Sequence, residues 1–138
     1  ILKQRLLAAI IAEEINRQAE KKHKIQDCLV ELKVANEPNK SGILPEQASE
    51  LATKISRLPN INLRGVMAMA PFFNNPEDTR PYFRRVKQIF DKIMADGGRR
   101  IPPVAGDSGI LSMGMSNDFT VAIEEGANMV RIGSALFK

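Results

Sequence analysis

Stretches with helical periodicity alternate along this chain with short apolar runs of strand length. Apolar residues recur at helical spacing from residue 1 to about 22, again after Pro45, and in an amphipathic stripe after Thr79. The strand-like runs are Cys28–Val34, Leu63–Ala70, a region around 104–113 that two glycines break, and Ala127–Ile132. A helix followed by repeated β–α units is typical of parallel strands with right-handed crossovers. We therefore expect an α/β fold built on a parallel sheet.

Two shorter helices are expected near the C-terminus. Ser116 or Asn117 is positioned to cap a helix that runs through Glu125, and Gly133 opens a last helix. Parallel barrels usually close with eight strands, so four strands form either a small open sheet or part of a larger barrel. We expect an amphipathic helix over residues 1–25, followed by a single β/α domain over residues 26–138.

Composition excludes several classes of function. The net charge is +4, and the basic residues are dispersed over separate segments, so a nucleic acid partner is not expected. Cys28 is the single cysteine and His23 the single histidine, which predicts neither a disulfide nor a metal site. The sequence has no apolar run of the ~18 residues that a membrane span needs. We expect a soluble protein of the cytoplasm, with a mitochondrial share as a further option.

Two turns rich in glycine and serine carry the clearest chemical signal. The first lies in Leu111–Asp118 and the second in Met129–Ser134, and each follows an apolar run and opens a predicted helix. A helix start offers unpaired backbone N–H groups to an anion, and serine adds a hydroxyl donor. The candidate binding residues are Gly114, Met115, Ser116, Gly133 and Ser134, which we call the phosphate cup. Either serine alone can also be a simple helix cap.

Arg131 adds a cation between these two turns. It alternates with Val130 and Ile132 in an apolar run, so its side chain points opposite to theirs. An unpaired guanidinium inside a barrel is costly, so Arg131 needs a partner. That partner is either a ligand or a structural acid such as Asp107.

Several short motifs resemble the pyridoxal phosphate homeostasis protein family, single-domain relatives of the alanine racemase N-terminal barrel. They are Asn39–Ile43, Leu63–Met67, Thr79–Phe83, Leu111–Asp118, Ala122–Ala127 and Met129–Phe137. The resemblance implies that residues 26–138 are the second half of a TIM-type (β/α)8 barrel, strands five to eight. It also implies a cofactor, pyridoxal 5'-phosphate (PLP).

The family resemblance assigns roles to the candidate residues. The phosphate cup would hold the cofactor phosphate, and Arg131 would face the pyridine nitrogen. Because an arginine donates a hydrogen bond and stays protonated, that nitrogen would remain unprotonated. An unprotonated ring is a weaker electron sink, which suits carriage of the cofactor better than transamination.

The family's Schiff-base lysine lies on an early strand that has no counterpart in this chain. We therefore expect a truncated form and assign no catalytic residue. Lys40, in the loop after the first strand, is either a substitute contact to the cofactor or a solvated loop lysine.

The predicted function is a non-catalytic PLP-binding protein of the homeostasis type. One alternative is a PLP-dependent amino-acid racemase, which needs two opposed bases, but Tyr82 lies on the apolar stripe of a helix and is a poor candidate. The other alternative is a partial barrel that only self-associates through its open sheet edges. The expected partners are PLP and, through those edges, other copies of the chain.

Overall fold

The fold centres on a parallel sheet of three strands. The computed structural model describes residues 2–35, 42–95 and 109–137, with only the backbone for residues 2–5. The strands are β1 (Gln26–Leu32), β2 (Ile61–Ala68) and β3 (Ile110–Met113), in the order β1-β2-β3. β2 pairs in parallel with both neighbours. The predicted α/β class and parallel sheet are therefore confirmed.

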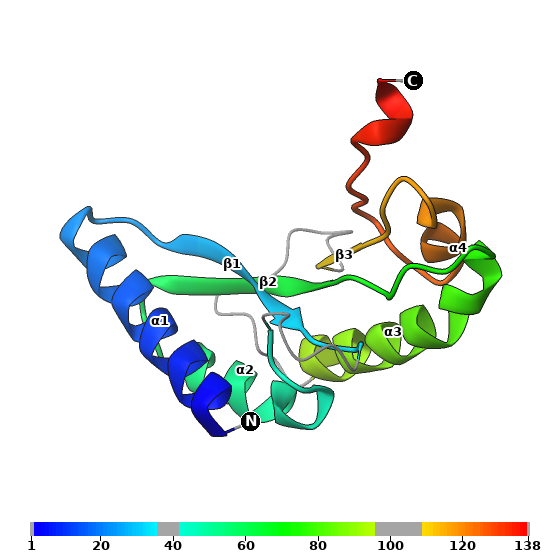
Figure 1. Ribbon diagram of the computed structural model, residues 1–138. Helices are drawn as coiled ribbons and strands as arrows, with labels where there is room; N and C mark the ends of the chain where they lie inside the picture. The colour runs from blue at the N-terminus through cyan, green and yellow to red at the C-terminus, as the bar shows by residue number, and fades with distance from the viewer. Residues whose placement is uncertain (1, 36–41, 96–108, 138) are drawn as a thin grey trace.

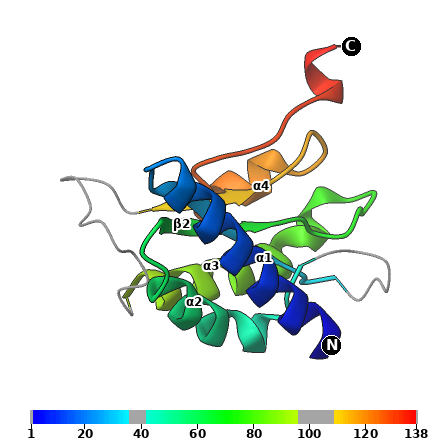
Figure 2. The same ribbon diagram turned by 90° about the vertical axis from the view of Figure 1, so that its left-hand side faces the viewer.

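Helices connect these strands and cover the sheet. They are α1 (Leu2–Lys21), α2 (Ala48–Ser56), α3 (Arg80–Ala95) and α4 (Phe119–Glu124), with 3-10 turns η1 (Pro45–Gln47), η2 (Pro76–Thr79) and η3 (Ser134–Leu136). Helices α1, α2 and α3 pack side by side against the sheet; in Figure 2 α2 and α3 lie below β2, α1 crosses in front of it, and α4 lies above it. In both views the segment after Gly133 extends away from the rest of the chain.

The core includes the apolar stripe of α3 and the central strand β2. On α3 the predicted stripe is buried: Phe83, Val86, Phe90 and Ile93 are each at most 6% exposed. The central strand β2 is buried on both faces, as expected for a parallel strand between two neighbours. Helix α3 and strand β2 therefore form a core that holds the strand ends in place.

Close approach of β2 and β3 depends on Gly65. A Cβ atom at this position would lie 1.8 Å from the carbonyl oxygen of Ile110. No side chain fits there without separating the strands. Gly65 therefore explains one glycine of the Leu63–Met67 motif in purely structural terms.

The predicted fourth strand is much shorter than expected. Residues 127–132 form one isolated bridge, Ser112 to Met129, instead of a strand. The segment still runs beside β3, because the N–H of Met113 donates to the carbonyl of Met129 (3.1 Å) and the N–H of Arg131 to that of Gly114 (2.9 Å). Within the described residues this segment therefore pairs with β3 through a single bridge in place of a ladder.

The two C-terminal helices also differ from the prediction. The first begins at Phe119 with Asp118 before it, so neither Ser116 nor Asn117 is the cap. The second is the single 3-10 turn η3. Both are too short for a strong helix dipole, so any anion site here rests on individual donors.

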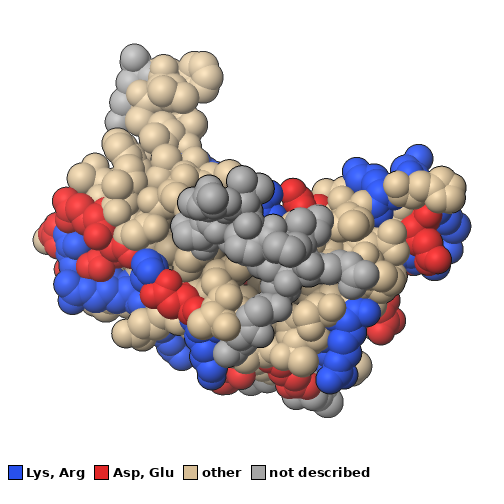
Figure 3. Space-filling model, turned by 180° about the vertical axis from the view of Figure 1, so that it is seen from behind, with Lys and Arg blue, Asp and Glu red and all other residues tan. Residues whose placement is uncertain are grey.

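Charge is mixed over the visible surface. On the face shown in Figure 3, acidic and basic side chains alternate, and the described residues of the projecting C-terminal segment are uncharged. Among the described residues no helix is long and apolar enough to cross a membrane. The same residues contain no group of His, Cys, Asp and Glu side chains suited to a metal ion.

Candidate functional site

The two predicted turns meet at the carboxyl ends of β2 and β3. The Ser116 hydroxyl oxygen accepts hydrogen bonds from the backbone N–H groups of Gly133 and Ala135, both at 3.2 Å. Gly133 follows Ser116 by 17 residues in the sequence, and Ala135 follows it by 19. The structure therefore brings the N–H groups of Gly133, in the phosphate cup, and of Ala135, just beyond it, to the Ser116 hydroxyl.

The five residues of the phosphate cup have different surroundings. Gly114 is buried with φ +108°, and a Cβ there would lie 2.8 Å from that of Ala122. Gly133 is exposed, and a Cβ there would meet no atom within 4 Å. Met115 is 40% exposed, and Ser134 is exposed at the start of η3. Gly114 thus serves the turn, whereas the space at Gly133 is open.

Asp118 holds the first turn closed, and sequence reasoning did not single it out. The backbone N–H of Met115 donates to Asp118 Oδ1 at 2.8 Å, and the N–H of Asp118 donates to the carbonyl of Met115 at 3.1 Å. The Asp118 side chain accepts this bond inside the fold, since the residue is only 5% exposed. An aspartate three residues after the start of a turn was the available signal.

Asn117 and Asn128 fix the segments around the phosphate cup. Asn117 Nδ2 donates to the carbonyl of Phe73 at 3.0 Å, which ties the turn after β3 to the loop after β2. The Asn128 amide accepts from the N–H of Leu111 and donates to the carbonyl of Gly109, both at 2.8 Å. Asn128 therefore sets the register of the segment that carries Arg131.

Arg131 points across the strand ends, as its alternation with Val130 and Ile132 predicts. Its Nη1 donates to Ser112 Oγ at 3.2 Å, and its Nη2 donates to the carbonyl of Ala68 at 3.0 Å. Its Nε is buried and has no hydrogen-bond partner. The described partners of this cation are neutral, and its two hydrogen bonds use only two of its five N–H donors.

Four further residues were discussed from the sequence. Lys40 and Asp107 lie outside the described residues. Tyr82 is half-buried on α3, with its ring 5.8 Å from that of Phe73. Cys28 is half-buried on β1, where burial and the neighbouring Asp27 carboxylate raise the pKa of its thiol.

Comparison with known families gives a match over nearly the whole chain. The family model for the alanine racemase N-terminal domain matches residues 8–138. The pyridoxal phosphate homeostasis protein of Aquifex aeolicus is 43% identical over 127 residues, which are 92% of this chain and 53% of that protein. The protein of the same name from Vibrio alginolyticus is 36% identical over 92% of this chain and 51% of its own length. The chain thus spans about half the length of these relatives.

Solved structures agree with these matches. A protein of unknown function from Bifidobacterium adolescentis superposes with a TM-score of 0.81 at 33% identity, over 94% of this chain and 49% of that one. PipY of Synechococcus elongatus, solved with PLP bound, gives a TM-score of 0.74 at 25% identity, over 94% of this chain and 57% of that one. The fold is accordingly that of part of a (β/α) barrel.

Proposed function

The chain belongs to the alanine racemase N-terminal domain family, and from that premise we propose that it binds PLP as a non-catalytic protein of the homeostasis type. The observation that carries the proposal is the meeting of Ser116 with the N–H groups of Gly133 and Ala135 beside the Arg131 guanidinium. We also propose the cytoplasm as its location, a reducing compartment with which the lone thiol of Cys28 is compatible.

The donors present fit the polar groups of PLP. The open space beside the backbone of Gly133 leaves room for a phosphate oxygen to approach the N–H groups that Ser116 now occupies. The Arg131 guanidinium has N–H groups beyond those bonded to Ser112 and Ala68, and a pyridine nitrogen is an acceptor. Phosphate and ring would thus engage different donors of one site.

Arg131 decides which chemistry this site favours. When bound, PLP supplies an aldehyde that can hold an amine and a ring that can withdraw electrons. A guanidinium donates to the ring nitrogen but retains its own proton, so the ring stays a weak electron sink. Ser112 and the Ala68 carbonyl hold the guanidinium in place. These residues bind and orient a cofactor, which suits a carrier.

Racemase activity is the weaker alternative. It requires two bases on opposite faces of the substrate. Tyr82, the tyrosine of this chain, is half-buried on α3 and packs against Phe73, so the ring is held by the fold. We propose that the chain does not exchange the α-proton of amino acids faster than free PLP does.

Titration of the chain with PLP tests the proposal. We expect an absorbance change that saturates, and roughly tenfold weaker binding in Arg131→Gln, because a hydrogen bond from a charged donor is lost. Arg57→Gln is the matched control, since Arg57 is exposed and follows α2. Circular dichroism checks that both variants remain folded.

Two results would decide against the proposed role. An unchanged spectrum at saturating PLP would exclude cofactor binding by this chain. Amino-acid deuterium exchange above the rate of free PLP would favour the racemase instead. Borohydride reduction followed by peptide mass analysis then identifies any lysine that the cofactor reaches, Lys40 included.

A further inference from the structure

A cluster of ion pairs joins the start of α3 to the end of α4. Arg80, the first residue of α3, donates from Nη2 to Glu124 at 2.6 Å and from Nη1 to Glu125 at 3.2 Å. It also donates from Nε and Nη2 to the two carboxylate oxygens of Glu77, both at 2.8 Å. Figure 1 shows the start of α3 beside α4, although Arg80 and Glu124 lie 44 residues apart in the sequence. The guanidinium therefore gathers three carboxylates from two distant segments.

The turn η2 gives Arg80 a fixed base. The N–H of Glu77 donates to Asn75 Oδ1 at 3.1 Å, and the buried hydroxyl of Thr79 donates to the carbonyl of Pro76 at 2.6 Å. Glu77 contacts the guanidinium through both of its oxygens, which fixes the plane of that group. The orientation of Arg80 is thus set by residues 75–79, independently of α4.

Helix α4 needs support from outside because it is short. It has six residues, and a helix of this length has little stability of its own in water. Its buried residues, Val121 and Ala122, lie in the middle of the helix. Apolar packing therefore holds the middle of α4, and the ion pairs to Arg80 hold its end at Glu124 and Glu125.

The end of α4 controls how the two halves of the phosphate cup meet. The first half ends at Ser116, before α4, and the second half begins at Gly133, after it. Just beyond Glu125 the chain reverses, and the N–H of Ala127 bonds to the carbonyl of Ala122 at 3.0 Å. The position of this reversal sets where the return segment begins, and so the approach of Gly133 to the Ser116 hydroxyl at 3.2 Å. Hydrogen bonds of that length tolerate little displacement.

The start of α4 is tied to the same part of the chain as its end. Asn117, two residues before α4, donates from Nδ2 to the carbonyl of Phe73 at 3.0 Å. The ring of Phe73 contacts that of Tyr82 on α3, with 5.8 Å between the ring centres. The segment from Phe73 to Arg80 therefore holds α4 at both ends.

We propose that Arg80 is a positioning residue of the cofactor site, an inference that rests on the proposed function. It holds the end of α4 so that the two halves of the phosphate cup meet. Without its charge the three carboxylates would repel one another, and the end of α4 would move away from η2. Arg84 also donates to Glu125 (2.8 Å), but its side chain is 64% exposed, so it replaces little of the lost attraction.

Titration with PLP tests the effect on the site. Arg80→Gln should bind PLP roughly fivefold more weakly than the parent, because displaced donors no longer meet the phosphate together. Arg84→Gln removes the same charge one turn further along α3 and should bind as the parent does. Arg80→Lys keeps the charge without the bidentate contact, so its affinity should lie between those of Arg80→Gln and the parent.

Glu124→Ala tests the same contact from the side of α4. The Glu124 side chain is 54% exposed and alanine favours a helix, so this variant should fold even where Arg80→Gln does not. It should weaken PLP binding in the same direction. Thr120→Ala, at an exposed position of α4, is the matched control and should bind as the parent does.

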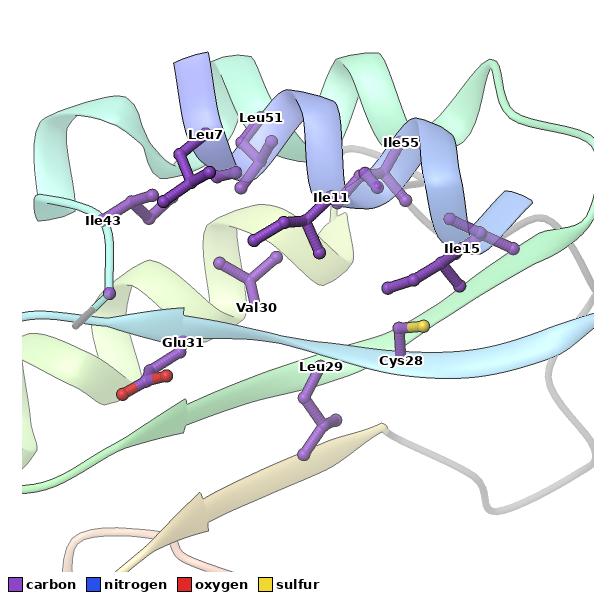
Figure 4. Close-up of a pocket in the computed structure, with 14 residues that line it drawn as sticks. Leu7, Ile11, Ile15, Cys28, Leu29, Val30, Glu31, Ile43, Leu51 and Ile55 are labelled. Atoms are coloured by element: carbon purple, nitrogen blue, oxygen red, sulfur yellow. The ribbon is translucent and has the colours of Figure 1, made fainter. Parts of the chain in front are cut away.

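A variant destabilised elsewhere separates positioning from stability. Ile55 of α2 lines the apolar groove that α2 forms with α1 and β1 (Figure 4), and the residues around this groove all precede α3 in the chain. Ile55→Val removes a buried methylene group, so it should lower stability and leave PLP binding unchanged. Equal weakening of PLP binding in Ile55→Val and Arg80→Gln, at equal stability to urea, would show a general loss of stability and would overturn the proposal.

Amide hydrogen exchange without PLP tests the position of the phosphate cup independently of cofactor binding. In Arg80→Gln the N–H groups of Arg131 and Gly133 should exchange several-fold faster, whereas those of the β1–β2 ladder should keep the rates of the parent. Unchanged exchange at Gly133 would overturn the role of Arg80. A parent chain that fails to bind PLP would overturn the proposed function alone, because faster exchange at Gly133 would still show that Arg80 holds the cup.

Discussion

The Ser116 hydroxyl oxygen lies 3.2 Å from the backbone nitrogen of Gly133, and this contact joins the turn after β3 to the last segment of the chain. The same oxygen also accepts a hydrogen bond from the N–H of Ala135. Both of its lone pairs are then used, so the hydroxyl is left with its O–H group as a donor. The N–H groups of Gly133 and Ala135 thus both point at the Ser116 hydroxyl in the absence of an anion. A phosphate oxygen entering here would find the donors already in position.

Replacement of Ser116 by alanine should weaken PLP binding roughly tenfold, because the hydroxyl donor and the link between the two turns are both lost. Equilibrium dialysis against PLP measures the change. Ser49→Ala on α2 is the matched control and should bind as the parent does. Equal binding by both variants would remove Ser116 from the site.

The two glycines of the phosphate cup should respond in opposite ways to alanine. Gly114→Ala forces a Cβ against Ala122 at a φ of +108° and should lower the free energy of unfolding by about 2–4 kcal/mol. Gly133→Ala meets no atom within 4 Å, so it should leave stability unchanged and weaken PLP binding. Urea unfolding together with PLP titration separates the two effects. A destabilised Gly133→Ala would contradict the open space described at that residue.

Periodicity was sufficient for the parts of the fold where the burial of apolar residues is regular. The stripe on α3 and the central strand β2 follow directly from the spacing of apolar residues. Residues 127–132 have strand-like composition, but they pair with β3, itself only four residues long, through a single bridge, and composition does not show the length of that neighbour.

Sequence reasoning predicted the direction of the Arg131 side chain and missed the residues that support it. The alternation of Val130, Arg131 and Ile132 predicted the direction of the guanidinium. Its actual partners, the Ser112 hydroxyl and the Ala68 carbonyl, come from two other strands, so only the sheet register could show them. Asp118 was missed because a side chain that bonds to the backbone inside a turn looks like a helix cap in the sequence.

Asn128 should matter for both stability and binding. Alanine at this position removes the side-chain amide that bonds to the N–H of Leu111 and to the carbonyl of Gly109. The loss of these two hydrogen bonds should lower the free energy of unfolding by about 2 kcal/mol. The segment carrying Arg131 would lose its register, so PLP binding should weaken as well. Chemical denaturation and PLP titration measure the two losses. Asn74→Ala, at an exposed loop position, should change neither quantity.

Acid should destabilise the contact between α3 and α4 through Glu125. Burial raises the pKa of this carboxyl, but hydrogen bonds from Arg80 (3.2 Å) and Arg84 (2.8 Å) outweigh that effect, and the net pKa is lowered. A carboxyl with a lowered folded pKa contributes stability that is full above its unfolded value of roughly 4.3 and is lost as the pH falls through the folded value. Unfolding free energy should therefore fall with pH in that window.

Glu125→Gln isolates this contribution, because glutamine keeps the shape of the side chain and cannot titrate. The variant should lose about 2 kcal/mol at pH 7, since Glu125 is only 13% exposed and its carboxylate no longer pairs with Arg84 or Arg80, although Arg80 keeps Glu77 and Glu124. Below pH 4 the difference from the parent should shrink, because the parent carboxyl is then being protonated too. Glu46→Gln is the control: its carboxylate is 66% exposed and 3.7 Å from Arg85, a surface pair that contributes little. A stability difference at Glu125 that stays constant from pH 7 to pH 3 would show that packing, and not the ion pair, accounts for its effect.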